Sequence, residues 1–249
     1  MIPQILPGSA DEFRLLTDAV GEKGYRQIDI NLGCPFPMIA GKHKGAGMLL
    51  YPAQVAEVLA PIAEYPEIQF SLKMRLGWEN ASECMVLVEL LNTLRLSRIA
   101  LHARTGKQQY KGHPDLEAFQ GFYELCQHPL YYNGDIESLS DIRQILTRFP
   151  LLKGVFIGRG LLSSPLLAKE FKGNETFLPE QRMSIYFAFH EELFSAYSQV
   201  LQGETQLLVK MKTLWEYFLP ETDRKLLKRI KKSTRLQQYT ESVKAIFTS

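Results

Sequence analysis

A single cysteine, Cys34, lies in a segment whose residue types could support proton transfer, because Asn31 precedes it by three residues and a glycine- and lysine-rich loop follows. Gly33 and Pro35 flank the thiol and interrupt the alternating apolar and polar run before it. A free thiol, with a pKa of about 8.5, can donate a proton near neutral pH as readily as it acts as a nucleophile. A small buried hydrophobic residue is the ordinary alternative for a cysteine. The break in the run favours an exposed, positioned thiol.

Other polar side chains recur where short apolar runs end. Such runs cover residues 4–6, 27–32, 68–74, 98–102, 130–133 and 154–157 and read as strands. The polar residues at five consecutive run ends are Asn31 with Cys34, Lys73 with Arg75, His102 with Arg104, Asn133 with Asp135, and Gly158 with Arg159. The carboxyl ends of parallel barrel strands meet on one face, where active sites lie. We therefore expect these residues to share a site.

Two of these residues have plain structural alternatives. Lys73 lies within an apolar run, where an unpaired ammonium is costly, so it should reach the barrel mouth or meet an electron-rich group such as the pyrimidine end of a flavin. Pairing on the outer face with Glu79 or another helix acid is the alternative. His102 could be a satisfied core histidine, but it leads directly into the polar loop that contains Arg104 and Tyr110.

The segment after the sixth run has the character of a phosphate-binding turn. Gly158, Arg159 and Gly160 stand between the run and an apolar helix start, and the last βα loops of such barrels bind phosphate through backbone N–H groups. A tight turn without a ligand is the alternative reading. No spacing of His, Cys, Asp or Glu indicates a metal site.

Helical periodicity fills the intervals between the runs, for example at 11–21, 53–64, 84–94 and 140–149. Alternating strands and helices predict parallel βαβ units and a TIM-type (β/α) barrel. The strand pattern stops near Gly173, and amphipathic helices at 181–201 and 204–218 follow. We expect a barrel domain over residues 1–173 and a helical domain over residues 174–249.

Composition places the chain among soluble proteins of a reducing cytoplasm. Of its 249 residues 45% are hydrophobic and 22% charged, and no run has the roughly 18 to 20 apolar residues that a membrane span needs. We expect neither a membrane segment nor a secretory leader. Its three cysteines include no CxxC pair, which argues against a disulfide framework.

Charge is unevenly distributed along the chain. The net charge is +2, but from Glu204 onward ten Lys or Arg stand against five acids. This basic end could contact a polyanion, or it could be a solvated helix face. The candidate phosphate contacts are Lys225, Lys228, Arg229, Lys231 and Lys232.

Taken together, the motifs resemble those of the tRNA-dihydrouridine synthases, flavoenzymes that reduce uridine in tRNA. The resemblance rests on INLGCPFP with GAGMLL, LKMRLGW, HARTGKQQYKG, NGDI and GVFIGRGLLSSP in the family's order, and on VKMKTLWEYF in the helical part. It implies a tRNA-binding helical domain, Cys34 as the catalytic acid, and Asn31 and Arg104 near the target base. The FMN ligands that it implies are Gln4, Lys73, His102, Asn133, Gly134, Asp135, Gly158 and Arg159.

The chemistry implied by the resemblance is hydride transfer from reduced FMN to C6 of uracil and protonation of C5 by Cys34, with NADPH as the expected source of electrons. The base must leave its stack, and phosphate contacts can offset that cost. Family members carry about sixty residues before the strand matching PQILP, residues 3–7, so the barrel is expected to lack its first two strands. A flavin barrel acting on a small molecule, which has no need of a basic tail, and an inactive RNA-binding fragment are the alternatives.

Overall fold

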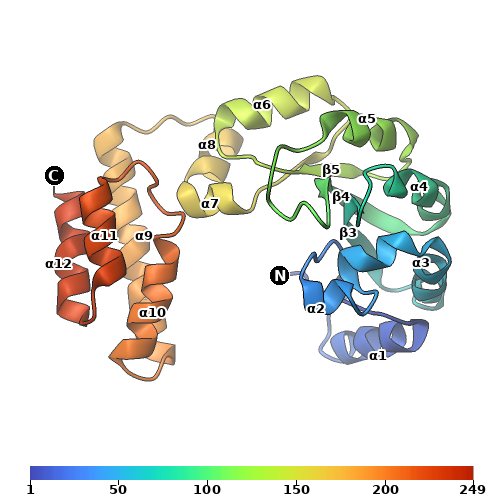
Figure 1. Ribbon diagram of the computed structural model, residues 1–249, viewed down its shortest axis with the longest axis horizontal. Coiled ribbons are helices and arrows are strands. Elements are labelled where there is room, and N and C mark those ends of the chain that lie inside the picture. The colour runs from blue at the N-terminus through green and yellow to red at the C-terminus, as the bar shows by residue number, and fades with distance from the viewer. Residues whose placement is uncertain (249) are drawn as a thin grey trace. The chain divides into compact units, whose positions relative to one another are not determined.

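The computed structural model describes residues 1–248, which divide into two compact units (Figure 1). The first comprises Met1–Asp135 and Ile142–Phe156, and the second comprises Ile136–Asp141 and the chain from Ile157 onward. Helices α7 and α8 therefore belong to the second unit. The division into a barrel domain of 1–173 and a helical domain of 174–249 stays a prediction.

A six-stranded, wholly parallel sheet forms the centre of the first unit, with its strands in sequential order from β1 to β6. The strands are β1 (Gln4–Ile5), β2 (Gln27–Leu32), β3 (Gln69–Gly77), β4 (Leu96–Thr105), β5 (Leu130–Asn133) and β6 (Gly154–Phe156). Each strand lies beside the next one in the chain, as in a (β/α) barrel, and six of the eight strands of such a barrel are present in the described chain. The predicted parallel α/β fold class is confirmed. Strands β3 and β4 are longer than predicted, so Arg75 and Arg104 lie within strands.

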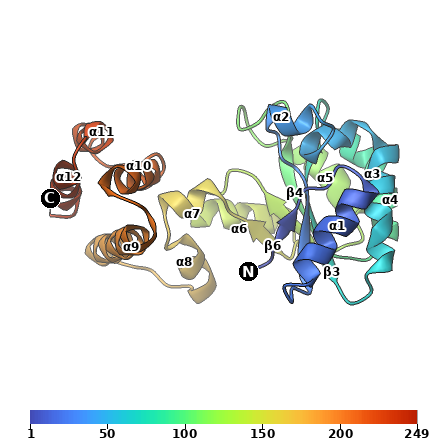
Figure 2. The same cartoon turned by 90° about the horizontal axis from the view of Figure 1, so that it is seen from below.

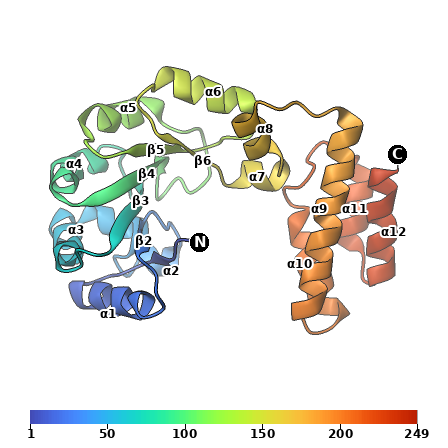
Figure 3. The same cartoon turned by 180° about the vertical axis from the view of Figure 1, so that it is seen from behind.

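One face of the sheet is apolar and covered by helices. Ile30, Leu72 and Leu101 are fully buried on this face. Figures 1 and 3 show the covering helices along the same side of the sheet. They are α1 (Ala10–Gly21), α3 (Pro52–Leu59), α4 (Glu83–Thr93), α5 (Leu116–Leu125) and α6 (Leu139–Arg148). Burial of this face supplies the hydrophobic stabilisation that holds the strand ends in place.

Local sequence explains where several helices begin and end. The Ser9 side chain caps α1 by accepting the N–H of Glu12 at 3.2 Å. The helix predicted over 53–64 is α3 followed by a 3₁₀ segment, η2 (Ala60–Glu64), because Pro61 has no N–H to continue the α-helical pattern. Sequence reasoning missed α2 (Pro37–Ala40) and the 3₁₀ segment η1 (Gly45–Leu50), which order the loop after Cys34.

The second unit is helical, and its helices α9 to α12 are seen nearly end-on in Figure 2. Its helices are α7 (Arg159–Ser163), α8 (Leu167–Gly173), α9 (Pro179–Val200), α10 (Glu204–Leu214), α11 (Arg224–Lys232) and α12 (Leu236–Phe247). Trp215 and Tyr239 are fully buried in its core, where the indole N–H donates to the Tyr239 hydroxyl at 2.9 Å. That hydroxyl lies 2.6 Å from Nε2 of buried His190. The polar centre of this core is thereby satisfied.

Candidate active site and basic groove

The second face of the sheet carries rows of polar side chains at matching register. Asp29 of β2 is paired with Ser71 of β3, and Asn31 with Lys73. The next row along this face contains Arg75, His102 and Asn133, paired across β3, β4 and β5. Because side chains alternate between the faces of a strand, these residues all project from the face opposite the apolar one. The structure thus brings together the strand-end residues predicted on β2 to β5.

Cys34 follows β2 by two residues and is partly exposed. The carbonyl oxygen of the Asn31 side chain accepts the N–H of Gly33 and that of Cys34, both at 2.9 Å. This turn replaces the strand ladder at its end and fixes the main chain of Cys34. The predicted thiol at the end of a strand is therefore present.

The loop after Cys34 packs back on the thiol-bearing residue. The carbonyl of Cys34 accepts the N–H of Ala46 at 3.0 Å. Gly45 has a φ of +56°, and a β-carbon on it would lie 2.8 Å from the Cys34 carbonyl oxygen. Only glycine fits this left-handed, crowded position without displacing Cys34.

Lys73 and His102 present polar ends that the protein leaves unused. Within residues 1–248, neither side chain takes part in an ion pair or hydrogen bond found in the structure. Burial lowers the pKa of Lys73, and the Arg75 charge adds to this effect. The alternative of a Lys73–Glu79 pair is wrong, because Glu79 pairs with Lys107 at 2.5 Å.

His102 is electrically neutral at physiological pH. It is 6% exposed, and burial lowers its pKa to about 3, with Arg75 and Lys73 acting in the same direction. A neutral imidazole offers one N–H donor and one acceptor nitrogen. It can therefore form hydrogen bonds with a bound group without adding charge to the site.

Arg104 and Asp135 are joined to each other. The Arg104 side chain is 1% exposed, and its two terminal nitrogens donate to the Asp135 carboxylate at 2.8 and 2.5 Å. Asp135, with a φ of +37°, follows Gly134, with a φ of +149°, so a strained turn presents the carboxylate. The bond to Asp135 raises the pKa of Arg104. The predicted roles of Arg104 at the target base and of Asp135 at FMN stay predictions.

The remaining predicted cofactor residues of the first unit are also near strand ends. Gln4, on β1, receives the Asn31 side-chain N–H at 2.8 Å and donates to Asp29 at 2.6 Å. Asn133 donates to the carbonyl of Phe156 at 2.9 Å, and its side-chain oxygen forms no hydrogen bond within residues 1–248. Their ligand roles remain predictions.

Sequence reasoning missed the role of Arg75 inside the protein. Arg75 is 2% exposed and donates to three main-chain carbonyl groups, those of Gly33, Thr105 and Gln109. Its guanidinium also lies 5.6 Å from the ring centre of Tyr110. The signal available in the sequence was a second cation two residues after Lys73, on the same face of the strand.

The predicted phosphate turn lies in the second unit. Gly158 precedes α7, and a β-carbon placed on it would meet open space, so a ligand could approach its backbone closely. Arg159 is the first residue of α7 and is partly buried. Their contact with a phosphate stays a prediction.

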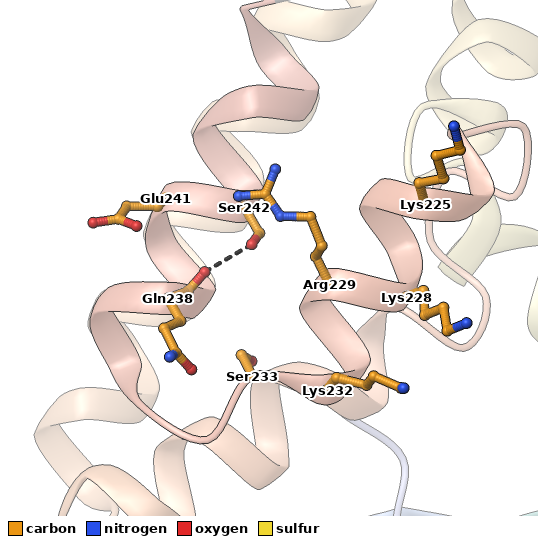
Figure 4. A pocket seen from close by; sticks show the side chains of 8 residues that line it. All are labelled: Lys225, Lys228, Arg229, Lys232, Ser233, Gln238, Glu241 and Ser242. Carbon is orange, nitrogen blue, oxygen red and sulfur yellow. Dashed lines mark hydrogen bonds between the residues drawn. The ribbon is translucent and has the colours of Figure 1, made fainter.

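A basic groove of about 480 Å³ runs between α11 and α12 (Figure 4). It is lined by Lys225, Lys228, Arg229, Lys232, Ser233, Gln238, Glu241 and Ser242. Four of the five cations predicted to contact phosphate therefore share this groove, and the fifth, Lys231, is exposed but does not line it. In Figure 4 Arg229 reaches toward Ser242 on α12.

Residues 1–248 contain neither a metal-binding cluster nor a membrane-spanning helix. No group of three or more His, Cys, Asp or Glu side chains is arranged to hold a metal ion. Over the same residues, no helix is both long enough and apolar enough to cross a membrane.

Comparison with solved structures defines the class of fold. Histamine dehydrogenase from Rhizobium sp. 4-9 superposes with a TM-score of 0.51 at 16% identity, over 66% of this chain and 27% of that protein. The likeness concerns the fold alone, and with the sequential parallel sheet it places the first unit among (β/α) barrel-type proteins.

The sequence model of the dihydrouridine synthase (Dus) family matches residues 2–248, so the chain belongs to this family. The tRNA-dihydrouridine synthase B of Vibrio vulnificus (strain CMCP6) is 28% identical over 174 residues, which cover 67% of this chain and 54% of that protein. A probable tRNA-dihydrouridine synthase of Rhizobium leguminosarum bv. phaseoli is 32% identical over 139 residues, or 55% and 44% of the two chains. The chain spans about half the length of the curated relatives it matches.

Proposed function

We propose that this chain acts in the reduction of uridine to 5,6-dihydrouridine in tRNA, with FMN as cofactor and NADPH as reductant. The observation that carries the proposal is a thiol, Cys34, held at the end of β2 in a chain of the dihydrouridine synthase family. Two unused polar groups, Lys73 and His102, lie on the next two strands. The names of the curated relatives support the substrate class.

Cys34 is proposed as the acid that delivers a proton to C5 of the uracil ring. Bound FMN, when reduced, supplies the hydride for C6. A proton delivered at the right moment prevents negative charge from accumulating on the ring, provided that the thiol is within hydrogen-bond reach. The Asn31 turn and the Ala46 contact hold the main chain of Cys34 for that purpose.

The ammonium group of Lys73 and the imidazole nitrogens of His102 are suited to polar contacts with a flavin ring. An ammonium group that has no ion pair gains from the electron-rich pyrimidine end, and a neutral imidazole can donate to or accept from a ring heteroatom. Gln4, Asn133, Gly134 and Asp135 are proposed to complete the ring site. Gly158 and Arg159 are proposed to hold the phosphate.

Flavin titration tests this assignment without relying on catalysis. Lys73→Met removes a charge-assisted hydrogen bond, so the FMN dissociation constant should rise by about 10- to 100-fold. Lys107→Met, which removes the cation of the exposed pair with Glu79, is the matched control and should bind FMN like the wild type. Equal affinities for all three proteins would remove Lys73 from the flavin site.

The groove between α11 and α12 is proposed to bind the tRNA backbone. Its four cations suit phosphate groups, and each lost contact should reduce the salt dependence by about 0.7 to 0.9 log units of affinity per log unit of salt. Lys228→Ala should show this reduction. Lys231→Ala, on the same helix but outside the groove, should not. An equal change for both variants would attribute binding to the whole charged helix instead.

The reaction itself is tested by incubating the chain with FMN, NADPH and unmodified tRNA, and then measuring dihydrouridine by mass spectrometry of the nucleosides. The proposal expects dihydrouridine in amounts that exceed the enzyme. Binding of tRNA without product would favour an RNA-binding role, and turnover of NADPH with a small enone but not with tRNA would favour a small-molecule reductase.

A further inference from the structure

The loop that carries Cys34 has both of that residue's main-chain polar groups engaged. The N–H of Cys34 donates to Asn31 Oδ1 at 2.9 Å, and the Cys34 carbonyl accepts from Ala46 at 3.0 Å. The same Asn31 oxygen also accepts the N–H of Gly33. Few backbone motions are left to the thiol-bearing residue unless one of these bonds breaks.

Arg75 holds the same loop from the neighbouring strand. Its Nε donates to the Gly33 carbonyl at 3.0 Å, while Nη1 donates to the carbonyls of Thr105 and Gln109, each at 2.8 Å. Gln109 has a φ of +52°, an unusual value for a residue other than glycine. A buried guanidinium therefore ties the loop of Cys34 to the loop that follows β4.

Asn31 is itself held from the opposite side. Its Nδ2 donates to Gln4 Oε1 at 2.8 Å, and Gln4 Nε2 donates to Asp29 Oδ2 at 2.6 Å. The second oxygen of Asp29 accepts the hydroxyl of Ser71, also at 2.6 Å. This network fixes which end of the Asn31 amide faces the main chain of Cys34.

We propose that Asn31 and Arg75 are positioning residues for the Cys34 thiol. The inference rests on the proposed function of Cys34 as the acid, and it assigns Asn31 a role exerted through Cys34, because its side-chain oxygen accepts both N–H groups of the turn that carries the thiol. Displacement of an acid by about 1 Å can reduce a rate by roughly 100-fold. Two side chains that end on Gly33 and Cys34 prevent that displacement.

The test measures alkylation of Cys34 by iodoacetamide in the folded chain, with the modified peptides quantified by mass spectrometry. Asn31→Leu keeps the side-chain size but has no acceptor, and Arg75→Met has no donor. Asn31→Leu loses two hydrogen bonds to the loop, and Arg75→Met loses its bond to Gly33 and its two bonds to Thr105 and Gln109. Either loss should raise the opening of the loop, and with it alkylation of Cys34, by about 10- to 30-fold. Rates are compared at their high-pH plateau, so that ionisation of the thiol does not differ between variants.

Matched controls remove the same two side-chain groups, an amide and a guanidinium, at the other end of the sheet. Gln27→Leu removes an amide that bonds Gln69 across β2 and β3, and Arg95→Met removes a guanidinium bonded to the carbonyls of Tyr65 and Pro66. Both controls should alkylate at the wild-type rate. In every variant, Cys126 provides an internal reference that should not change. Asn31→Asp, which keeps the acceptor, should restore slow alkylation.

The kinetic consequence is measured separately by single-turnover oxidation of the reduced flavoprotein by tRNA. Asn31→Leu should lower this rate by about 10- to 100-fold and leave the tRNA dissociation constant within about twofold. Wild-type alkylation of Cys34 in both Asn31→Leu and Arg75→Met would overturn the positioning role. A wild-type rate for Cys34→Ala would instead refute the thiol as acid, and the alkylation comparison would still decide whether Asn31 and Arg75 hold the loop.

Discussion

The neutral, buried His102 predicts a specific loss of stability in acid. Its pKa is lowered from 6.5 to about 3 in the folded protein, chiefly by burial. Between these two values the unfolded chain binds a proton that the folded chain does not, so the stability present above pH 6.5 is lost as the pH falls. From pH 7 to pH 5 this difference in proton binding lowers the free energy of unfolding by about 2 kcal/mol. His102→Gln, a neutral residue, should lack this contribution.

The assay is urea unfolding of the flavin-free protein at pH 7, 6 and 5. Trp78 lies in the first unit and Trp215 in the second, so a Trp215→Phe background makes tryptophan fluorescence report the unit that contains His102. From pH 7 to pH 5, the free energy of unfolding of the protein with His102 should fall by about 2 kcal/mol more than that of His102→Gln. His190, whose pKa burial also lowers, lies in the other unit and cancels in the comparison. Parallel stability curves for the two proteins would refute the argument that His102 resists protonation.

Two further changes test how the site is held. Gly45→Ala places a β-carbon at a φ of +56° and 2.8 Å from the Cys34 carbonyl oxygen. We expect the free energy of unfolding in urea to fall by about 1 to 3 kcal/mol and the alkylation of Cys34 to become faster. An unchanged free energy of unfolding would contradict the crowding at this position. Asp135→Asn leaves the buried Arg104 guanidinium without its carboxylate and should lower the free energy of unfolding by about 3 kcal/mol. Glu79→Gln breaks an exposed pair and should lower it by about 0 to 1 kcal/mol. Equal losses for the two variants would show that burial of the ion pair does not determine its contribution.

The sequence predicted the sheet well because its signal is local. Runs such as residues 27–32 and 130–133 carry alternating or continuous apolar residues between breakers, and they form β2 and β5 at those bounds. Strand ends on a parallel sheet share an edge by necessity, which is why Asn31, Lys73, His102 and Asn133 lie together.

Features that depend on distant partners were not predictable from one sequence. The acceptors of Arg75 are the main-chain carbonyls of residues 33, 105 and 109. Every residue type has such a carbonyl, so the sequence does not indicate which ones accept these bonds. The difference between Lys231 and its four neighbours arises from how α11 packs against α12, and it was invisible in a run of basic residues. The short 3₁₀ segment η1 is stabilised by the contact of Ala46 with Cys34, also a tertiary effect.

The central claim, that Cys34 is the acid in tRNA uridine reduction, is tested most directly by rapid mixing of reduced, FMN-loaded protein with unmodified tRNA, following the return of oxidised-flavin absorbance. The Cys34→Ala protein should bind tRNA and FMN with unchanged affinity and be reduced by NADPH at the wild-type rate. Its oxidation by tRNA should be slower by about 10²- to 10⁴-fold, the range typical of losing a positioned acid. Oxidation of Cys34→Ala by tRNA at a near wild-type rate would contradict the account.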